Sequence, residues 1–181
     1  NELEDLSFRI LQPDHYKAII ERLNFLQAEN KEAIDTITRE LTERLAAEGI
    51  ATRVKARVKS PYSIFAKIQR KSIALEQLSD MIGFRVIVNS VEQCYRTVGL
   101  VHTTWKVVPG RFKDYISVPK HNDYRSIHTT IVGPSRQRVE LQIRTEEMDR
   151  IAEFGIAAHA LYKDGASANL TRIENESRAY G

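Results

Sequence analysis

Short apolar runs alternate with longer segments of helical spacing along most of this chain, and this alternation constrains its fold more than any other feature. Residues 84–88 are rich in β-branched side chains, as is typical of a buried strand. In residues 139–143 apolar and polar side chains alternate, as in a strand with one buried face. On the same grounds we predict strands at 51–58, 84–88, 115–118, 127–132 and 139–143.

Helical segments are predicted between and around these strands. In residues 14–48 apolar side chains recur at helical spacing; Pro13 and Asp14 supply a start signal and Gly49 a stop signal. Further helices are predicted at 60–72, 91–102 and 146–162, and a turn at 133–136 predicts a hairpin of the last two strands. The pattern indicates an α+β (mixed α/β) domain, a mixed sheet flanked by helices.

Size and composition exclude several classes of protein. The chain has 181 residues, 42% of them hydrophobic and 28% charged, which is typical of one ordinary globular domain. No apolar run approaches the length of a membrane span. The single cysteine, Cys94, excludes an internal disulfide and a multi-cysteine zinc site. We therefore expect a reducing, cytoplasmic location, no membrane partner, and a core position for Cys94.

Charge is divided unevenly along the sequence. Residues 1–52 carry six basic and eleven acidic side chains, a net charge of −5. Residues 53–144 carry seventeen basic and six acidic ones, a net +11, and residues 145–181 carry four and seven, a net −3. The basic middle predicts a surface that binds anions, of which phosphates are the obvious candidates. Composition leaves open whether these belong to a nucleic acid or to a nucleotide.

Two carboxylates stand out in this basic region. Asp80 precedes the strand 84–88, and Glu140 projects from the strand 139–143. On neighbouring strands they could hold Mg²⁺ between them and a bound triphosphate. The alternative is that each carboxylate pairs with a nearby arginine.

A second group of candidates runs from a strand into a predicted helix start. Arg57, Lys59, Ser63 and Lys67 could bind phosphate oxygens there, although a solvated basic face is the simpler alternative. Tyr124 and His128 lie in a turn-rich segment and could contact a base and a phosphate, or serve only in packing and hydrogen bonding. The chain lacks a Gly-rich phosphate loop of the P-loop type.

Five motifs, in the same order, resemble the synthetase domain of the RelA/SpoT alarmone enzymes over residues 50–163. They are Arg57-Val-Lys59-Ser-Pro-Tyr-Ser63-Ile-Phe-Ala-Lys67 with Asp80-Met-Ile-Gly83-Phe-Arg85, Gly110-Arg111-Phe112-Lys113-Asp114-Tyr115, Pro119-Lys120-His-Asn122-Asp-Tyr124-Arg-Ser126-Ile-His128, Glu140-Leu-Gln142-Ile-Arg144-Thr145, and Ala152-Glu153-Phe-Gly155-Ile-Ala157-Ala158-His159.

The resemblance implies a nucleotidyltransferase-like fold with a mixed five-stranded sheet. It implies transfer of pyrophosphate from ATP to the 3′-hydroxyl of GTP or GDP, with AMP as the second product. Asp80 would ligate Mg²⁺, and Glu140 would help to hold the metal or act as general base. The implied nucleotide contacts are Arg57 and Arg85 on adenine, Lys59, Ser63 and Lys67 on the ATP phosphates, Tyr124 stacked on guanine, and Lys113, Lys120, Asn122, His128, Gln142 and Arg144 around the acceptor nucleotide.

The resemblance also predicts how the chain is organised. Residues 1–49 would be a helical segment that follows a hydrolase domain, 50–163 the synthetase domain, and 164–181 a linker. The basic motif at 111–114 predicts a bifunctional synthetase–hydrolase parent with further regulatory domains, for which the ribosome is a candidate partner. Ala56, Asp149 and Ala160 depart from the family pattern, and we expect them to bear on packing or regulation and not on chemistry.

Two other functions stay open at this point. An isolated domain of a regulated enzyme could bind nucleotides without turnover, as a silent or autoinhibited domain. An RNA-binding module would rest on the basic charge alone, and the sequence contains no RNA-binding motif.

Overall fold

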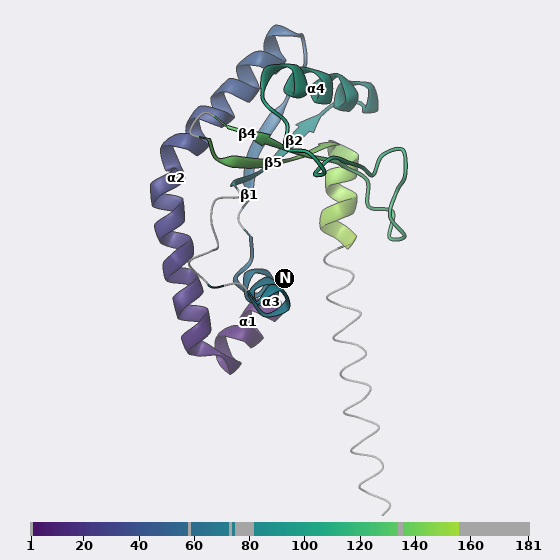
Figure 1. Cartoon of the computed structure of the whole chain (residues 1–181). Helices are drawn as coiled ribbons and strands as arrows, with labels where there is room; N and C mark the ends of the chain where they lie inside the picture. Colours follow the sequence, from purple (N-terminus) through teal and green to yellow (C-terminus); the bar gives the residue numbers. More distant parts are fainter. Residues whose placement is uncertain (1, 58, 73, 75–81, 134–135, 156–181) are drawn as a thin grey trace, which may run out of the picture.

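The computed structural model describes residues 2–57, 59–72, 74, 82–133 and 136–155. Its centre is a five-stranded sheet in the order β1-β2-β5-β4-β3 (Figure 1). The strands are β1 (Arg53–Arg57), β2 (Ile82–Val88), β3 (Lys113–Asp114), β4 (Ile127–Val132) and β5 (Arg138–Thr145). The labelled helices are α1 (Glu2–Leu11), α2 (Pro13–Ala47), α3 (Pro61–Lys71) and α4 (Val91–Thr104), and residues 146–155 form a further helix directly after β5.

The sheet is mixed, as predicted. β2 and β5 are parallel, whereas β1 pairs antiparallel with β2, and β4 pairs antiparallel with both β5 and β3. The predicted hairpin is confirmed as β4 and β5, and its turn is closed by a hydrogen bond from the Gly133 amide to the Gln137 carbonyl (2.8 Å). The sheet therefore places β5, with Glu140, between β2 and β4.

One predicted strand is wrong. Residues 115–118 form a turn and a bend, and the strand in this region is the two-residue β3 just before them. The Asp114 carboxylate accepts hydrogen bonds from the amides of Ile116 (2.9 Å) and Ser117 (3.0 Å). A side chain that binds the backbone two and three residues onward favours a turn over an extended strand.

One face of the sheet is apolar and belongs to the main core. Alternate residues of β2, β4 and β5 point into it, among them Phe84, Ile131 and Leu141, each 1% exposed or less. α4 covers this face with Cys94 and Val101, and the C-terminal half of α2 adds Ile37, Leu41 and Leu45. Burial confirms the core position of Cys94 and raises the pKa of its thiol to about 11, so this thiol is unreactive at neutral pH.

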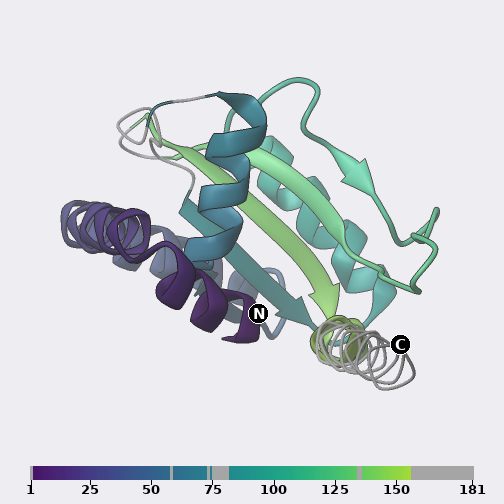
Figure 2. The ribbon, with the colours of Figure 1, turned by 90° about the horizontal axis from the view of Figure 1, so that it is seen from below.

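A second, small core lies away from the sheet, at the N-terminal end of α2. It joins Phe8 of α1, Ile19 of α2 and Ile64 of α3. The Phe8 ring lies 4.5 Å from the Phe65 ring and 5.7 Å from the Tyr16 ring, centre to centre. α3 therefore packs on α1 and α2, on the side of the sheet opposite α4 (Figures 1 and 2).

The ends of α3 follow from local sequence. Ser60 caps its N-terminus by accepting a hydrogen bond from the Ser63 amide (3.3 Å), and Pro61 occupies the first turn, as predicted. At 35 residues α2 is the longest of the described helices, and none of these helices combines the length and apolar character needed to cross a bilayer.

Candidate functional site

The other face of the sheet is polar, and the strand register lines up many predicted site residues on it. Arg57 pairs with Gly83, Gly83 with Glu140, and Glu140 with Thr130. The adjacent row runs across all five strands and consists of Lys55, Arg85, Gln142, His128 and Lys113. Because paired residues share a face of a sheet, these side chains project together. Glu140 is the one carboxylate that the described strands contribute to these two rows.

Glu140 also lies within reach of the segment that leads into α3. Its Oε2 is 3.7 Å from Lys59 Nζ. Glu140 thus has a cationic partner, as the alternative to a metal site predicted, but this partner is a lysine and not an arginine. Burial lowers the pKa of Lys67, and the positive charges of Lys59, Lys71 and Arg111 lower it further, while Glu140 acts in the opposite direction. Lys67 therefore lies in the electric field of Glu140. The helix that carries it, α3, runs alongside the sheet (Figure 2).

An aromatic cluster lies at the β3–β4 end of this face. Tyr124 Oη and His128 Nε2 are 2.7 Å apart, and the Tyr115 ring meets the rings of both residues edge-on. Lys120 Nζ lies over the rings of Tyr115 (4.3 Å) and Tyr124 (5.1 Å). Burial lowers the pKa of His128 to about 4, with help from the charges of Lys120 and Arg144. The imidazole is therefore neutral at pH 7 and forms a hydrogen bond without adding charge.

The loop before this cluster is held by Asp114. Its carboxylate accepts hydrogen bonds from Tyr95 Oη (2.9 Å) and from Ser117 Oγ, in addition to the two amides described above. Burial opposes ionisation, but these hydrogen bonds outweigh it and hold the pKa of Asp114 below its ordinary value. The ionised carboxylate thus fixes the turn that follows Lys113 and carries Tyr115.

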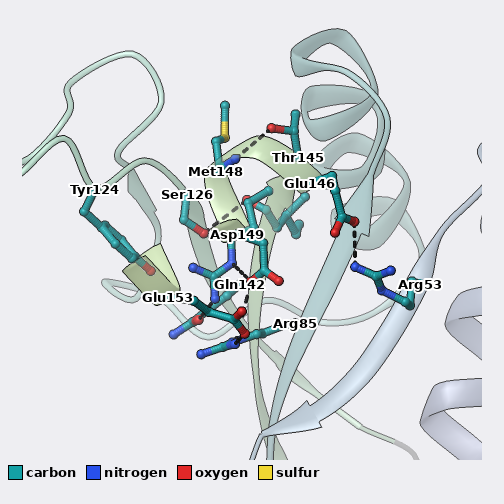
Figure 3. Close-up of polar contacts among 12 residues, drawn as sticks. Arg53, Arg85, Tyr124, Ser126, Gln142, Thr145, Glu146, Met148, Asp149 and Glu153 are labelled. Carbon is teal, nitrogen blue, oxygen red and sulfur yellow. Dashed lines mark hydrogen bonds and ion pairs between the residues drawn. The ribbon is translucent and has the colours of Figure 1, made fainter. Parts of the chain in front are cut away.

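Two of the predicted arginines meet at the start of helix 146–155 (Figure 3). Arg144 is 1% exposed; its Nε lies 3.2 Å from Asp149 Oδ1, and its Nη2 donates to Gln142 Oε1 (3.1 Å). Arg85 Nη1 lies 3.6 Å from the same Asp149 oxygen and 3.2 Å from Glu153 Oε1. Burial lowers the pKa of Arg144, but an arginine pKa starts so high that the group stays charged. Asp149 and Glu153 therefore hold two arginines of the polar face.

Most predicted site residues thus come together, and three need separate mention. Ser63 is exposed in the first turn of α3, where its hydroxyl accepts a hydrogen bond from Ser60 Oγ (2.8 Å). Asn122 is exposed and accepts a hydrogen bond from the Tyr124 amide (3.3 Å), so it shapes the loop. Asp80 lies outside the described residues, as do the predicted linker and the end of the predicted helix 146–162.

The contacts of Asp149 and Glu153 with the two arginines were not expected from the sequence. We expected Asp149 to bear on packing or regulation, but it contacts Arg85 and Arg144, two predicted nucleotide-binding residues. A signal was present: the two acids are four residues apart in an alanine-rich helix, so they lie on one helical face.

The carboxylate of Glu140 bears on the predicted magnesium site. Among the residues whose positions are known, no three acidic, histidine or cysteine side chains gather around a common point. Mg²⁺ is commonly bound through one or two carboxylates together with substrate phosphates, so a complete protein cage is not required. Glu140, a carboxylate surrounded by cations that suit a polyphosphate, fits such a site.

The family model described as the region found in RelA and SpoT proteins matches residues 56–167. This range contains every residue of the two rows on the polar face except Lys55. This chain belongs to the RelA/SpoT family. Its expected nucleotidyltransferase-like fold is also confirmed by solved structures. Small alarmone synthetase 1 from Bacillus subtilis, bound to its product pppGpp, is 25% identical with a TM-score of 0.64, covering 79% of this chain and 82% of that chain. Small alarmone synthetase 2 from the same organism is 29% identical with a TM-score of 0.63, covering 78% and 81%.

Curated relatives of this RelA/SpoT domain are much longer proteins. The GTP pyrophosphokinase rsh of Brucella abortus is 57% identical over 180 residues, which are 99% of this chain and 24% of that protein. The bifunctional (p)ppGpp synthase/hydrolase SpoT of Escherichia coli is 44% identical over 170 residues, which are 94% of this chain and 24% of that protein. The chain therefore spans about a quarter of the length of these relatives.

Proposed function

We propose that this domain transfers a pyrophosphoryl group from ATP to the 3′-hydroxyl of GTP or GDP, and so makes pppGpp or ppGpp together with AMP. The observation that carries the proposal is the polar face of the sheet, where two rows of cationic and hydrogen-bonding side chains flank the carboxylate of Glu140. Family membership and the likeness to a synthetase bound to pppGpp support it.

The reaction suits such a face because both substrates are polyanions. The acceptor 3′-oxygen forms a bond to the β-phosphorus of ATP, the bond between that phosphorus and the oxygen bridging to the α-phosphorus breaks, and AMP leaves. Phosphoryl transfers of this kind depend on positioning and on neutralising charge. Lys59 and Lys67 would bind the ATP phosphates beside Glu140, and Ser63 would add a hydroxyl at the start of α3.

The bases would be held by planar groups. Arg57 and Arg85 would pack on adenine, and Tyr124 would stack on guanine, because a flat ring and a guanidinium have matching faces. The acceptor contacts would come from the cluster around Tyr124 and the second row: Lys113, Lys120, Asn122, His128, Gln142 and Arg144. In the structure Lys120 lies over the Tyr124 ring, so it would move aside or slide along the ring when a base stacks there.

Magnesium would be held by Glu140 together with Asp80. When bound, Mg²⁺ supplies positive charge that stabilises the transferred phosphates. Glu140 would also be placed to take the proton of the acceptor hydroxyl. As partners of the domain we propose the two nucleotides and the remaining hydrolase and regulatory domains of a longer parent, with the ribosome as a candidate partner of that parent. A cytoplasmic location fits a chain whose single cysteine is a buried thiol.

A radiolabel assay tests the proposal. The purified protein is incubated with γ-labelled ATP, Mg²⁺ and either GTP or GDP, and the products are separated. We expect label in a guanosine penta- or tetraphosphate, with a loss of about 100-fold or more in Glu140→Gln and Asp80→Asn. The matched control is Glu92→Gln, which removes an exposed carboxylate in the first turn of α4 and should leave the rate unchanged. Nucleotide binding without labelled product would contradict the proposal and indicate a silent domain.

A further inference from the structure

Asp149 is a nearly buried carboxylate that lies between two arginines from neighbouring strands. It is 3% exposed, and its Oδ1 is 3.2 Å from Arg144 Nε on β5 and 3.6 Å from Arg85 Nη1 on β2 (Figure 3). The register pairs Arg85 with Gln142, two positions before Arg144, so the two guanidiniums approach the helix start from adjacent strands. One oxygen atom of a third element therefore contacts both arginines.

The two arginines depend on this carboxylate to different degrees. Arg85 has a second anionic partner, Glu153, whose side chain is 59% exposed. For Arg144, Asp149 is the one ion-pair partner found within the described part of the chain. A buried charge that loses its only counter-charge is strongly destabilised, so Arg144 should move or lose its fixed orientation when Asp149 is neutralised.

Several buried polar atoms of the cluster take part in ionic contacts without an aligned hydrogen bond. Arg85 Nε, Arg144 Nε, Arg144 Nη1 and Asp149 Oδ1 are buried and have no hydrogen-bond partner within the described residues. Asp149 thus holds the guanidiniums by charge at ion-pair distance and not through well-aligned hydrogen bonds. A buried donor without a hydrogen-bond partner is costly, so the orientation of these guanidiniums depends strongly on their ionic contacts with Asp149.

We propose that Asp149 is a positioning residue shared by the two nucleotide subsites: its carboxylate orients both Arg85, which serves ATP, and Arg144, which serves the acceptor. The inference rests on the proposed function, which assigns the two arginines to different nucleotides. It follows that one neutral substitution on helix 146–155 weakens the binding of both substrates, although the side chain that is changed need not touch either of them.

A purely structural role gives a different expectation. Asp149 lies in the early part of helix 146–155, where a carboxylate also interacts favourably with the helix dipole. Loss of that interaction alone would lower the melting temperature and leave the KM for each nucleotide as it was. The KM values, measured separately from kcat, therefore distinguish positioning from stability.

The test compares Asp149→Asn with Glu153→Gln. The first keeps the shape of the side chain and removes the charge shared by the two arginines; the second removes an exposed charge that contacts Arg85 alone. We expect Asp149→Asn to raise the KM for ATP and for the acceptor by about tenfold or more. Glu153→Gln should raise the KM for ATP by about threefold or less and leave the acceptor KM unchanged.

Asp149→Glu is a second variant for the case that Asp149→Asn does not fold. It keeps the charge and adds one methylene group. If Asp149→Asn does not fold, Asp149→Glu should fold, with a melting temperature near that of the parent and an increase in both KM values. An active protein in which neither variant changes the acceptor KM would overturn the inference.

Failure of the proposed function is a separate result. It would appear as an inactive parent protein, and the inference is then judged by calorimetric binding of ATP and of GDP. Both affinities must fall in Asp149→Asn; if either affinity equals that of the parent, the shared role of Asp149 is wrong.

Discussion

The two halves of the proposed site rest on different cores. Glu140, Gln142 and Arg144 project from β5, whose other face is buried in the main core under α4 and α2. Ser63 and Lys67 project from α3, which packs instead on α1 and the N-terminal half of α2 through the small core. The acceptor half is thus part of the sheet, whereas the ATP-phosphate half is attached to a helical extension.

α2 is the helix that enters both cores. Ile19 belongs to the small core and Ile37 to the main one, and eighteen residues of helix separate them by about 27 Å. α2 therefore connects the helical extension that carries α3 to the core of the sheet. Changes in the small core should affect the two nucleotides unequally, and changes in the main core should affect them alike.

The largest effect is expected from Phe84→Ala, which should weaken the acceptor half and the ATP-phosphate half of the site equally. Phe84 is fully buried in the main core, and loss of its ring should lower the free energy of unfolding by about 3–5 kcal/mol. Denaturant unfolding measures the loss. Binding of ATP and of GDP should then decline together. A selective loss of ATP binding would show that the main core does not support both halves of the site.

Phe8→Ala should separate the two halves. Phe8 is 4% exposed and joins α1 to α3, so its removal leaves α3 less firmly placed while the sheet stays intact. Calorimetry should show ATP affinity reduced by about tenfold and GDP affinity changed by less than about twofold. Phe25→Ala, which removes an exposed ring of α2, is the matched control and should change stability by less than about 0.5 kcal/mol. Equal losses for both nucleotides in Phe8→Ala would mean that the small core does not act on α3 alone.

A moderate, pH-dependent effect should be confined to the acceptor half. Burial lowers the pKa of His128 from 6.5 to about 4, so the unfolded chain takes up a proton first as the pH falls. The contribution of neutral His128 to stability is therefore complete above pH 6.5 and declines between pH 6.5 and about 4. NMR titration of the imidazole should give a midpoint near 4, and His128→Gln should flatten the decline in unfolding free energy over this range. A midpoint near 6.5 would show that the ring is solvated.

The smallest effect is expected from Arg53→Ala. Arg53 Nη2 lies 2.6 Å from Glu146 Oε2, but both side chains are about half exposed, in contrast to the nearby contact of Arg144 with Asp149. Water and salt screen exposed pairs, so the melting temperature and both nucleotide affinities should be the same as in the parent protein. A clear drop in melting temperature would show that the start of helix 146–155 depends on this pair as well.

Much of the fold could be predicted from periodicity. The predicted strand 127–132 has the bounds of β4, and the predicted helix 14–48 differs from α2 by one residue at each end. The strand predicted at 115–118 is wrong because apolar content does not reveal that the Asp114 carboxylate accepts hydrogen bonds from the amides of Ile116 and Ser117. The parallel pairing of β2 with β5 was not predictable from local spacing, because register is decided by packing between distant segments.

The site was predictable where residue type alone carries the chemistry. Lys59, Glu140 and Tyr124 were candidates by residue type, and the structure places Lys59 beside Glu140 and Tyr124 beside His128. Their roles in binding stay predictions. The role of Asp149 was hidden because an acidic residue in a helix usually faces water, and only the fold shows that this one is buried between two strand arginines. Asp80 remains a prediction.

The parallel pair at the centre of the sheet also has a consequence for synthesis of the chain. Each residue of β2 pairs with a partner 57 positions later, from Ile82 with Val139 to Val88 with Thr145. During translation β2 is made long before β5, so the centre of the sheet cannot be completed until β5 and then Asp149 are available. A nascent chain that stalls before β5 contains most of the proposed nucleotide-binding residues but lacks the strand that joins β2 to β4, so we expect it to be unable to arrange them on one sheet.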